Sequence, residues 1–238
     1  MITIENLSKA YNNVEVLNIP HLDIPNGQCF GLVGNNGAGK TTLFSLLLDL
    51  IAPNSGSVQN KDVIVNESED WKPFTSAFID ESFLIGYLTP EEYFYFIGEL
   101  RGQSKADIDA FLMPYTDFFN DEILNKKKYI RDLSKGNQKK VGVVAALIGS
   151  PEVIILDEPF ANLDPTTQFR LKAIIKEMAL NQKTTILISS HDLIHTTEVC
   201  SRIVVLNKGN IVKDIQTNTE TLKELEAFFS GGIFEAWE

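Results

Sequence analysis

The residues best suited to chemistry lie in one glycine-rich stretch, GNNGAGKTT. It follows the apolar run CFGLV and precedes the helix-period segment TLFSLLLDL, so the sequence predicts a strand, a tight loop and a helix. Glycines let backbone N–H groups converge on phosphate oxygens, and the helix presents the positive end of its dipole. We expect the Lys40 ammonium to bind β- and γ-phosphates and the Thr41 hydroxyl to ligate Mg²⁺. The predicted phosphate site comprises Gly34, Asn35, Asn36, Gly37, Ala38, Gly39, Lys40, Thr41 and Thr42.

Acidic residues at the end of a second apolar run fit the same chemistry. The run VIIL is followed by Asp157 and Glu158. We expect Asp157 to hold Mg²⁺ through water and Glu158 to orient and deprotonate an attacking water molecule. Two acids after an apolar run are a weak signal alone, and the phosphate loop is what favours this interpretation.

A third apolar run, TTILISS, ends at His191. Its imidazole is predicted to lie near the γ-phosphate as a hydrogen-bond donor. A lone histidine after a strand is more often a surface or capping residue. The functional interpretation is favoured because the carboxyl ends of parallel strands meet at one edge of a sheet.

These residues need a scaffold of alternating strands and helices. Short apolar runs bounded by turn residues predict strands, and helix-period segments such as QFRLKAIIKEMAL lie between them. This alternation is typical of an α/β fold with a mostly parallel sheet core and helices on both faces. Residues 1–26 and the segment SGSVQNKDVIVN contain strands without helices between them, so we predict an antiparallel β subdomain.

Residues 82–125 are rich in aromatic side chains at helical spacing and contain no convincing strand. We therefore predict an inserted helical subdomain over about residues 82–145, with most of the aromatic side chains in its core and a partner-docking surface as the alternative. Residues 213–238 are expected to form a short C-terminal tail. The whole chain, 1–238, is expected to be one domain.

Composition restricts the function further. The 238 residues carry 32 acidic and 21 basic side chains, a net charge of -11, which argues against nonspecific binding of nucleic acid or anionic lipid. The longest apolar stretches fall short of the roughly 18 residues that span a bilayer, and the first residues lack the apolar region of a secretory signal, so the chain is expected to begin near Met1. Cys29 and Cys200 are too few and too far apart for a disulfide framework or a metal cluster, so we expect buried thiols in a reducing compartment.

The motif LSKGNQ, shortly before VIILDEP, adds a feature that other phosphate-loop proteins lack. With it, the chain from about Leu7 to Val212 resembles the nucleotide-binding domain of ABC ATPases, and within them the bacterial exporter-type transporter subunits. The resemblance implies the P-loop NTPase fold of ABC type, ATP and Mg²⁺ as ligands, and a head-to-tail dimer. In that dimer the signature motif of one chain closes over ATP held by the other. The signature residues implied are Ser134, Lys135, Gly136, Asn137 and Gln138.

The resemblance assigns roles to residues outside the signature. Tyr11 and Val16 fall where the family stacks the adenine ring. Asp164 falls in the D-loop, which crosses between subunits, and His191 matches the switch histidine. Together with the phosphate loop, these matches imply a site built from two chains.

Two departures from the family pattern concern the same site. The usual Gln after the strand SAFI is replaced by Asp80, with Glu81 as an alternative alignment, and a carboxylate there can still hold Mg²⁺ or its water. Lys135 and Asn137 replace a Gly and a Gln of the signature. Lys135 belongs to a basic cluster that we interpret mainly as a solvated helix face, with a raised potential at the trans-bound nucleotide as the alternative for Lys135. The cluster comprises Lys126, Lys127, Lys128, Arg131, Lys135, Lys139 and Lys140.

The leading hypothesis is an ABC transporter subunit that hydrolyses ATP to ADP and phosphate and drives a separate membrane permease. It is expected to work as a homodimer, or as a heterodimer with a similar ATPase, in the cytoplasm at the face of the membrane. The alternative is a soluble ABC ATPase acting on a protein assembly, for example in cofactor-cluster assembly. Chromosome-type members are excluded, because the segment between Lys40 and Asp157 is too short for their coiled coil. A third hypothesis, a nucleotide-responsive binding module with little hydrolysis, rests on Asp80 and Lys135.

Overall fold

A six-stranded sheet forms the centre of the computed structural model, which describes residues 1–180 and 184–234. Its strands are β3 (Cys29–Val33), β6 (Thr75–Phe78), β7 (Val153–Asp157), β8 (Thr185–Ser190), β9 (Arg202–Asn207) and β10 (Asn210–Gln216). They lie in the order β10-β9-β3-β8-β7-β6, and all neighbours are parallel except β10 and β9. Every residue of β3, β7 and β8 is buried, as expected for parallel strands covered on both faces.

A smaller antiparallel sheet packs beside it. Its strands are β1 (Ile2–Tyr11), β2 (Val14–Ile24), β4 (Ser55–Asn60) and β5 (Val63–Ile64), in the order β2-β1-β4-β5. The two residues that connect β1 to β2, Asn12 and Asn13, have φ of 51° and 64°. Asparagine tolerates this left-handed region, and two such residues in a row suit the twist of a tight hairpin. The predicted antiparallel β subdomain is therefore present.

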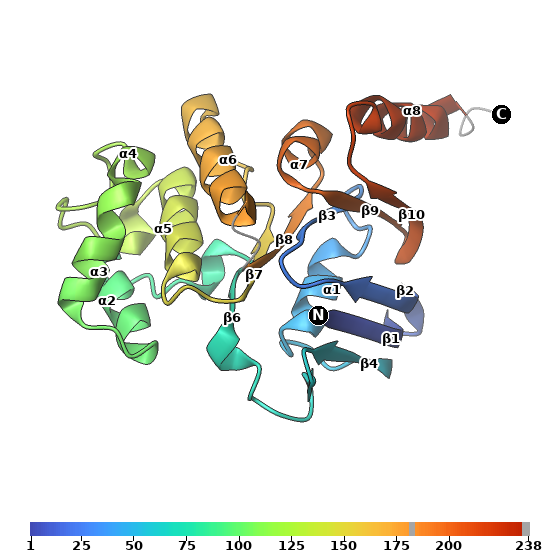
Figure 1. Ribbon diagram of the computed structural model, residues 1–238, viewed down its shortest axis with the longest axis horizontal. Coiled ribbons are helices and arrows are strands. Elements are labelled where there is room, and N and C mark those ends of the chain that lie inside the picture. Colours follow the sequence, from blue (N-terminus) through green and yellow to red (C-terminus); the bar gives the residue numbers. More distant parts are fainter. Residues whose placement is uncertain (181–183, 235–238) are drawn as a thin grey trace.

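Helices cover the larger sheet on both faces (Figure 1). They are α1 (Lys40–Leu47), α6 (Pro165–Leu180), α7 (Leu193–Val199) and α8 (Thr221–Phe234). Phe30 and Leu32 of β3 pack in one core cluster with α1 and the smaller sheet. Gly31 faces the other way, where a Cβ atom would stand 2.5 Å from a methyl carbon of Thr196 in α7. Alternating residues of one strand thus hold helices on opposite faces.

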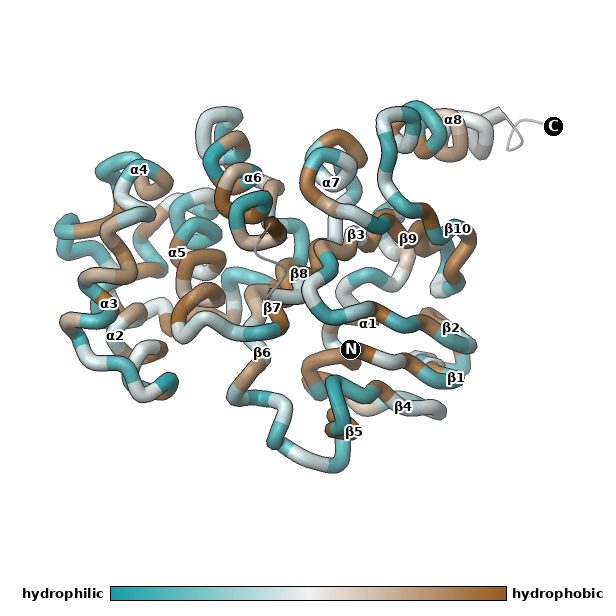
Figure 2. Tube along the Cα trace, in the orientation of Figure 1, coloured by the Kyte–Doolittle hydropathy of each residue, from teal (hydrophilic) through white to brown (hydrophobic). Residues whose placement is uncertain are grey.

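A group of helices is inserted between β6 and β7. It contains α2 (Pro90–Leu100), α3 (Lys105–Leu112), α4 (Thr116–Phe119) and α5 (Lys135–Leu147), with short 3₁₀ turns η2 (Glu81–Phe83), η3 (Met113–Tyr115) and η4 (Ile130–Asp132). A further 3₁₀ turn, η1 (Lys72–Phe74), directly precedes β6. Figure 2 shows apolar residues concentrated along the larger sheet and α5. Gly142 of α5 lets that helix approach β6, because a Cβ atom there would stand 2.1 Å from the Phe78 ring.

The aromatic side chains of these helices divide between core and surface. Phe94, Phe118 and Phe119 are fully buried and contact one another. Phe83 and Tyr87, in contrast, are 59% and 72% exposed. The expected aromatic core is therefore present, and part of the aromatic surface remains open to solvent.

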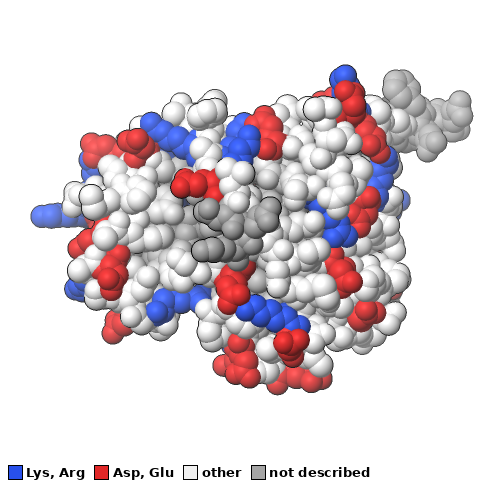
Figure 3. Space-filling view, in the orientation of Figure 1, with Lys and Arg blue, Asp and Glu red and all other residues white. Residues whose placement is uncertain are grey.

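Lys139 and Lys140 are buried, in contrast to the solvated face that was expected for most of the basic cluster and that its other members form. Lys139 meets the end of β7, whereas Lys140 lies 3.5 Å from Glu122 in the segment after α4. Lys126, Lys127 and Lys128 are exposed, as expected. Over the face drawn in Figure 3, acidic and basic side chains are interspersed.

Cys29 and Cys200 are buried free thiols, and the fold brings them together from distant parts of the sequence. Their Sγ atoms lie 3.7 Å apart. Burial, followed by the hydrogen bond with Cys29, raises the pKa of the Cys200 thiol well above its ordinary value. These thiols act as small apolar residues of the core.

The end of the chain differs slightly from the expected boundary. Strand β10 continues to Gln216, so the C-terminal segment starts after that residue rather than at 213. It forms α8, and residues 235–238 lie outside the described part. Within the described residues, no helix combines the length and the apolar character needed to cross a membrane.

Candidate nucleotide and catalytic site

The glycine-rich loop joins β3 to α1 and curls around the first turn of the helix. Gly37 and Gly39 have φ of 80° and 107°, a region that strains residues with a side chain. A Cβ atom on Gly34 would stand 2.3 Å from the Leu206 backbone oxygen. The Ala38 amide donates to the Asn35 oxygen at 3.0 Å, which closes the turn. The glycines are therefore required by backbone conformation and by close packing.

Lys40 lies at the centre of this loop and is only 6% exposed. Its ammonium donates to the backbone oxygens of Gly34, at 2.7 Å, and Asn35, at 3.3 Å. It also lies 3.5 Å from Oε1 of Glu158. The Lys40 ammonium is thus held between the loop and the end of β7, next to the N-terminus of α1.

Asp157, the last residue of β7, connects the loop to two strands. Its Oδ2 accepts from the Thr41 hydroxyl at 2.5 Å, and its Oδ1 accepts from the Ser189 hydroxyl. Burial raises the pKa of the Asp157 carboxyl above its ordinary value, although the hydrogen bonds from Ser189 and Thr41 act in the opposite direction. Ser189 was not among the predicted site residues; its register opposite Asp157 in the neighbouring parallel strand is the signal that points to it.

The oxygens of Thr41 and Asp157 suit a hard cation. Mg²⁺ prefers oxygen ligands and usually takes few from the protein, with water and phosphate supplying the others. The described residues contain no group of three or more His, Cys, Asp or Glu side chains placed to hold a metal ion. The residues present therefore fit a magnesium ion that is shared with a nucleotide, and do not form a closed protein cage.

Glu158 follows β7 with its backbone in the left-handed region, φ 47°. Such a conformation costs a residue with a side chain about 1 to 2 kcal/mol, so other contacts must hold it. The Glu158 amide donates to the Ser189 hydroxyl at 3.0 Å. Its Oε2 lies 2.9 Å from Nδ1 of His191, while Oε1 faces Lys40. The structure thus brings Glu158, His191 and Lys40 into one cluster, as the sequence predicted.

The signature motif begins α5. Ser134 caps the helix, and its hydroxyl accepts from the Asn137 amide at 3.2 Å. Ser134 and Lys135 are exposed. A Cβ atom on Gly136 would stand 2.8 Å from the Asn162 backbone oxygen, so this first turn packs tightly on the loop after β7. The helix N-terminus is open to solvent beside that loop, where an anion can approach.

Gln138 differs from its neighbours in the motif. Its side-chain amide is buried and donates to the backbone oxygens of Ile130, at 3.0 Å, and Leu133, at 3.1 Å. Gln138 was expected to contact ATP, but its side chain is turned into the protein. Gln138 instead fastens the loop that leads into α5, because buried amides need internal partners.

Asp80 and Glu81 follow β6 and point in different directions. Asp80 is exposed and accepts from the Ser82 amide at 2.8 Å; hydrogen bonding from the Ser82 side chain, followed by that from its amide, lowers the pKa of the Asp80 carboxyl. The Glu81 side chain is only 12% exposed, and its Oε1 lies 3.6 Å from Nζ of Lys139. Of the two possible metal contacts, Asp80 thus has the solvent-exposed carboxylate and Glu81 the buried one.

The remaining residues lie around this centre. Asp164 directly precedes α6 and accepts from the Thr167 hydroxyl and amide, and those hydrogen bonds lower the pKa of its carboxyl. The Val16 backbone lies beside Gly39, where a Cβ atom would stand 3.0 Å from the Val16 oxygen. The Tyr11 ring is half exposed, with the Lys9 ammonium 5.1 Å from its centre.

Comparison with known proteins decides the family. The family model described as ABC transporter matches residues 17–161, more than half of the chain. This chain belongs to the ABC transporter family. Bacillus subtilis YhaQ, an uncharacterised ABC transporter ATP-binding protein, is 35% identical over 89% of this chain and 70% of its own length. The bacitracin transport ATP-binding protein BcrA of Enterococcus faecalis is 31% identical over 90% and 69%.

Solved structures agree on the fold. The ATP-binding subunit of an ABC transporter has a TM-score of 0.80 at 25% identity, covering 95% of this chain and 93% of that one. A dimeric post-hydrolysis ATP-binding cassette bound to ADP and Pi has a TM-score of 0.81 at 21% identity, covering 92% and 99%, which shows the fold alone. The expected ABC-type α/β fold and the expected role as ATP-hydrolysing subunit of an ABC transporter are confirmed.

The predicted site residues of this ABC cassette lie in two separate groups. The phosphate loop, Asp157, Glu158 and His191 meet at the edge formed by β3, β7 and β8. Among the described residues, no hydrogen bond or ion pair joins residues 134–138 to this loop. The fold of one chain thus brings together only one of the two sets that the family resemblance assigns to ATP.

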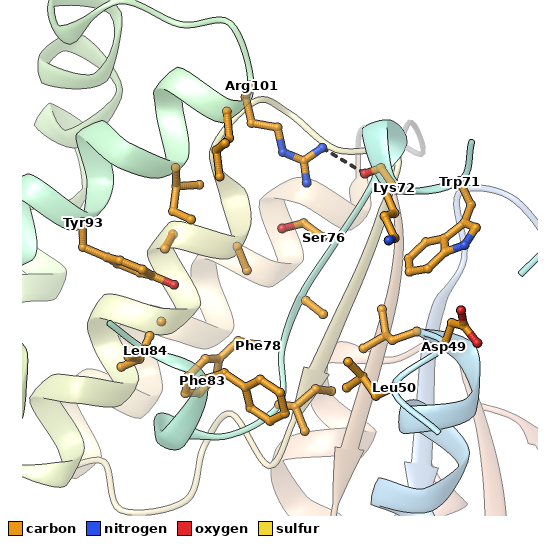
Figure 4. A pocket seen from close by; sticks show the side chains of 18 residues that line it. Asp49, Leu50, Trp71, Lys72, Ser76, Phe78, Phe83, Leu84, Tyr93 and Arg101 are labelled. Carbon is orange, nitrogen blue, oxygen red and sulfur yellow. Dashed lines mark hydrogen bonds between the residues drawn. The ribbon is translucent and has the colours of Figure 1, made fainter. Parts of the chain in front are cut away.

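A cleft of about 450 Å³ lies away from the phosphate loop (Figure 4). Tyr93 of α2 and Trp71 face each other across it, and Phe83 and Leu50 close its lower side in the view. The Arg101 guanidinium donates to backbone oxygens at residues 72, 73 and 75, which fixes one wall. The sequence did not predict this cleft.

Proposed function

We propose that the chain hydrolyses ATP in sites built from two chains and drives a separate permease at the cytoplasmic face of a membrane. The observation that carries the proposal is the separation of the exposed signature turn, headed by Ser134, from the phosphate loop of its own chain. A second cassette, identical or similar, supplies Ser134, Gly136 and the neighbouring residues to complete each site. Asp164 lies next to this surface and contributes to the contact between chains.

Within one site each residue has a separate task. The loop amides and Lys40 bind the β- and γ-phosphates, and the Tyr11 ring and Val16 hold the adenine. Thr41 and Asp157 hold Mg²⁺, which when bound neutralises charge on the phosphates. Asp80 follows β6, which pairs in parallel with β7, so it lies at the same edge of the sheet as Asp157 and is proposed to reach this ion through water.

Glu158 acts on the attacking water. Its Oε1 lies against Lys40 and its Oε2 against His191, so the carboxylate has a fixed orientation. Glu158 accepts a proton from water, the water oxygen bonds to the γ-phosphorus, and the bond from phosphorus to the ADP oxygen breaks. His191 orients the carboxylate and donates toward the γ-phosphate. The products are ADP and phosphate.

The cleft beside α2 is the proposed permease contact. Its lining is mainly apolar, and Phe83 and Leu100 stand 59% and 68% exposed at its margin. Large exposed apolar side chains around a cleft mark an interaction site. The cleft borders β6 and α5, so a permease segment seated there would press on the segment containing Asp80 and on the signature helix.

Turnover of purified protein with Mg²⁺ tests the proposal. Wild type should hydrolyse ATP slowly, and Lys40→Ala should abolish hydrolysis by removing the phosphate cation. Glu158→Gln should retain ATP and accumulate a dimer on size-exclusion chromatography, because binding remains and proton transfer is lost. Unchanged turnover of Glu158→Gln would refute the assignment of the base.

A further inference from the structure

Lys139 joins three segments that meet behind the catalytic carboxylate. It lies in the second turn of α5, and its side chain is 7% exposed. Its ammonium donates to the Glu158 backbone oxygen at 2.7 Å and lies 3.6 Å from Oε1 of Glu81. One buried cation thus links the signature helix, the end of β7 and the segment after β6.

Glu81 depends on this cation. Its Oε1 is buried and has no hydrogen-bond partner among the described residues. Among the described residues, Lys139 is the only basic side chain whose charged nitrogen lies within 4.0 Å of this oxygen. Burial of an uncompensated carboxylate is costly, so Glu81 and Lys139 hold each other in place.

The main chain of Glu158 also depends on Lys139. The left-handed backbone of Glu158 is fixed on one side by its amide bond to Ser189. On the other side, its carbonyl oxygen accepts from the Ala161 amide at 3.2 Å and from Lys139. The main chain must stay in this conformation for the carboxylate to face both Lys40 and His191.

We propose that Lys139, held by Glu81, is a positioning residue for ATP hydrolysis that fixes the main chain of Glu158 relative to the signature helix. The proposal rests on the proposed role of Glu158 as base. Lys139 has no hydrogen bond or ion pair with the phosphate loop, so its effect falls on turnover and spares ATP affinity. Because Lys139 and Ser134 share α5, a shift of that helix against a second chain moves the anchor of the catalytic carboxylate.

Lys139→Met tests this directly, since methionine keeps the apolar stem and removes the ammonium. We expect kcat to fall about tenfold or more, with KM and the affinity for a fluorescent ATP analogue within about twofold of wild type. Lys139→Arg should recover kcat to within about threefold, because it keeps the charge and the donors. An unchanged kcat for Lys139→Met, or a loss confined to KM, overturns the proposal.

Lys140→Met is the matched control. Lys140 is equally buried in the same turn, but its ion pair is with Glu122 and it makes no contact with Glu158. It should lower the melting temperature and leave kcat within about twofold of wild type. If Lys140→Met lowers kcat as much as Lys139→Met does, the effect is general loosening of α5 and the proposal fails.

A double variant separates stability from positioning. Lys139→Met alone leaves the Glu81 carboxylate buried without a cation, which can impair folding. Glu81→Gln with Lys139→Met removes that charge and should restore the melting temperature while kcat stays low. Recovery of wild-type kcat in the double variant would mean that the Glu158 carbonyl contact is dispensable, contrary to the proposal.

The Glu158→Gln background distinguishes this proposal from the proposed function. There, Lys139→Met should cause no further loss of the slow residual hydrolysis, measured in single-turnover reactions, and a further tenfold loss would show an action independent of Glu158. If Glu158→Gln itself turns over at the wild-type rate, the assignment of the base is wrong. If Glu158→Gln is inactive and Lys139→Met is fully active, only the positioning role is wrong.

Discussion

The Thr41 hydroxyl and Oδ2 of Asp157 lie 2.5 Å apart although 116 residues separate them in the chain. The contact joins the first turn of α1 to the last residue of β7. It draws together a hydroxyl and a carboxylate that both belong to the predicted magnesium site. The buried carboxylate has a cost in stability, which makes the site testable without nucleotide.

Asp157→Asn should inactivate the protein and stabilise it at neutral pH. Burial raises the folded-state pKa of Asp157 above 3.8, so the ionised carboxylate destabilises the fold, and stability falls as pH rises through that pKa. Asparagine removes this cost, and the melting temperature at pH 7 should rise by roughly 1 to 3 °C. The gain should shrink as pH falls through the raised folded-state pKa and vanish well below pH 3.8, where Asp157 is protonated in both states. Calorimetry across this pH range checks it, with the exposed Asp121→Asn as control; a stability loss at pH 7 would contradict it.

His191→Ala should lower kcat by about 100-fold with little change in stability, because the imidazole orients Glu158 and is itself largely exposed. ATP binding, measured by calorimetry, should persist. His21→Ala is the matched control, since His21 contacts Glu5 and Asp23 on the smaller sheet. Equal turnover of the two variants would remove His191 from the mechanism.

Two inactive variants should restore activity when mixed. Lys40→Ala breaks phosphate binding, and Ser134→Ala breaks the signature, at a cost of about 1 kcal/mol for the lost helix cap. In a mixed dimer, one site receives the intact Lys40 of one chain and the intact Ser134 of the other. An equimolar mixture should therefore regain roughly a quarter of wild-type turnover if the sites act independently. No recovery, with mixed dimers present, would argue against sites shared between chains.

If the cleft is the permease contact, binding to the membrane protein can be lost without loss of ATP hydrolysis. Phe83→Glu with Leu100→Glu places charges at the margin of the cleft, where both side chains are already exposed, so folding and basal ATP hydrolysis should change little. Copurification with a membrane protein and any stimulation by it should be lost. Phe96→Glu, an exposed aromatic position of α2 outside the cleft, should retain both. Copurification of the wild type with a soluble partner and no permease would favour the alternative hypothesis instead.

The sequence predicted the parts of the site that depend on local order. The loop around Lys40 and the acids after β7 were recognisable because strand, turn and helix follow one another within a few residues. Lys139 was not, because adjacent lysines in a polar run are typical of a solvated face. Its burial depends on Phe78 meeting Gly142 and on the end of β7, which are distant in sequence. The direction of Gln138 and the cleft near Trp71 likewise depend on tertiary packing.

The adjacent buried thiols of Cys29 and Cys200 also allow local opening of the fold to be measured by thiol labelling. One sulfur belongs to the strand that carries the phosphate loop, and the other follows α7, which comes after His191. Reagents that alkylate thiols reach these sulfurs only when β3 and α7 separate, because both are buried and the Cys200 thiol resists ionisation. The labelling rate of the unaltered protein therefore reports how often β3 and α7 separate at the end of the sheet opposite the phosphate loop, and bound ATP should slow it by stabilising the folded chain.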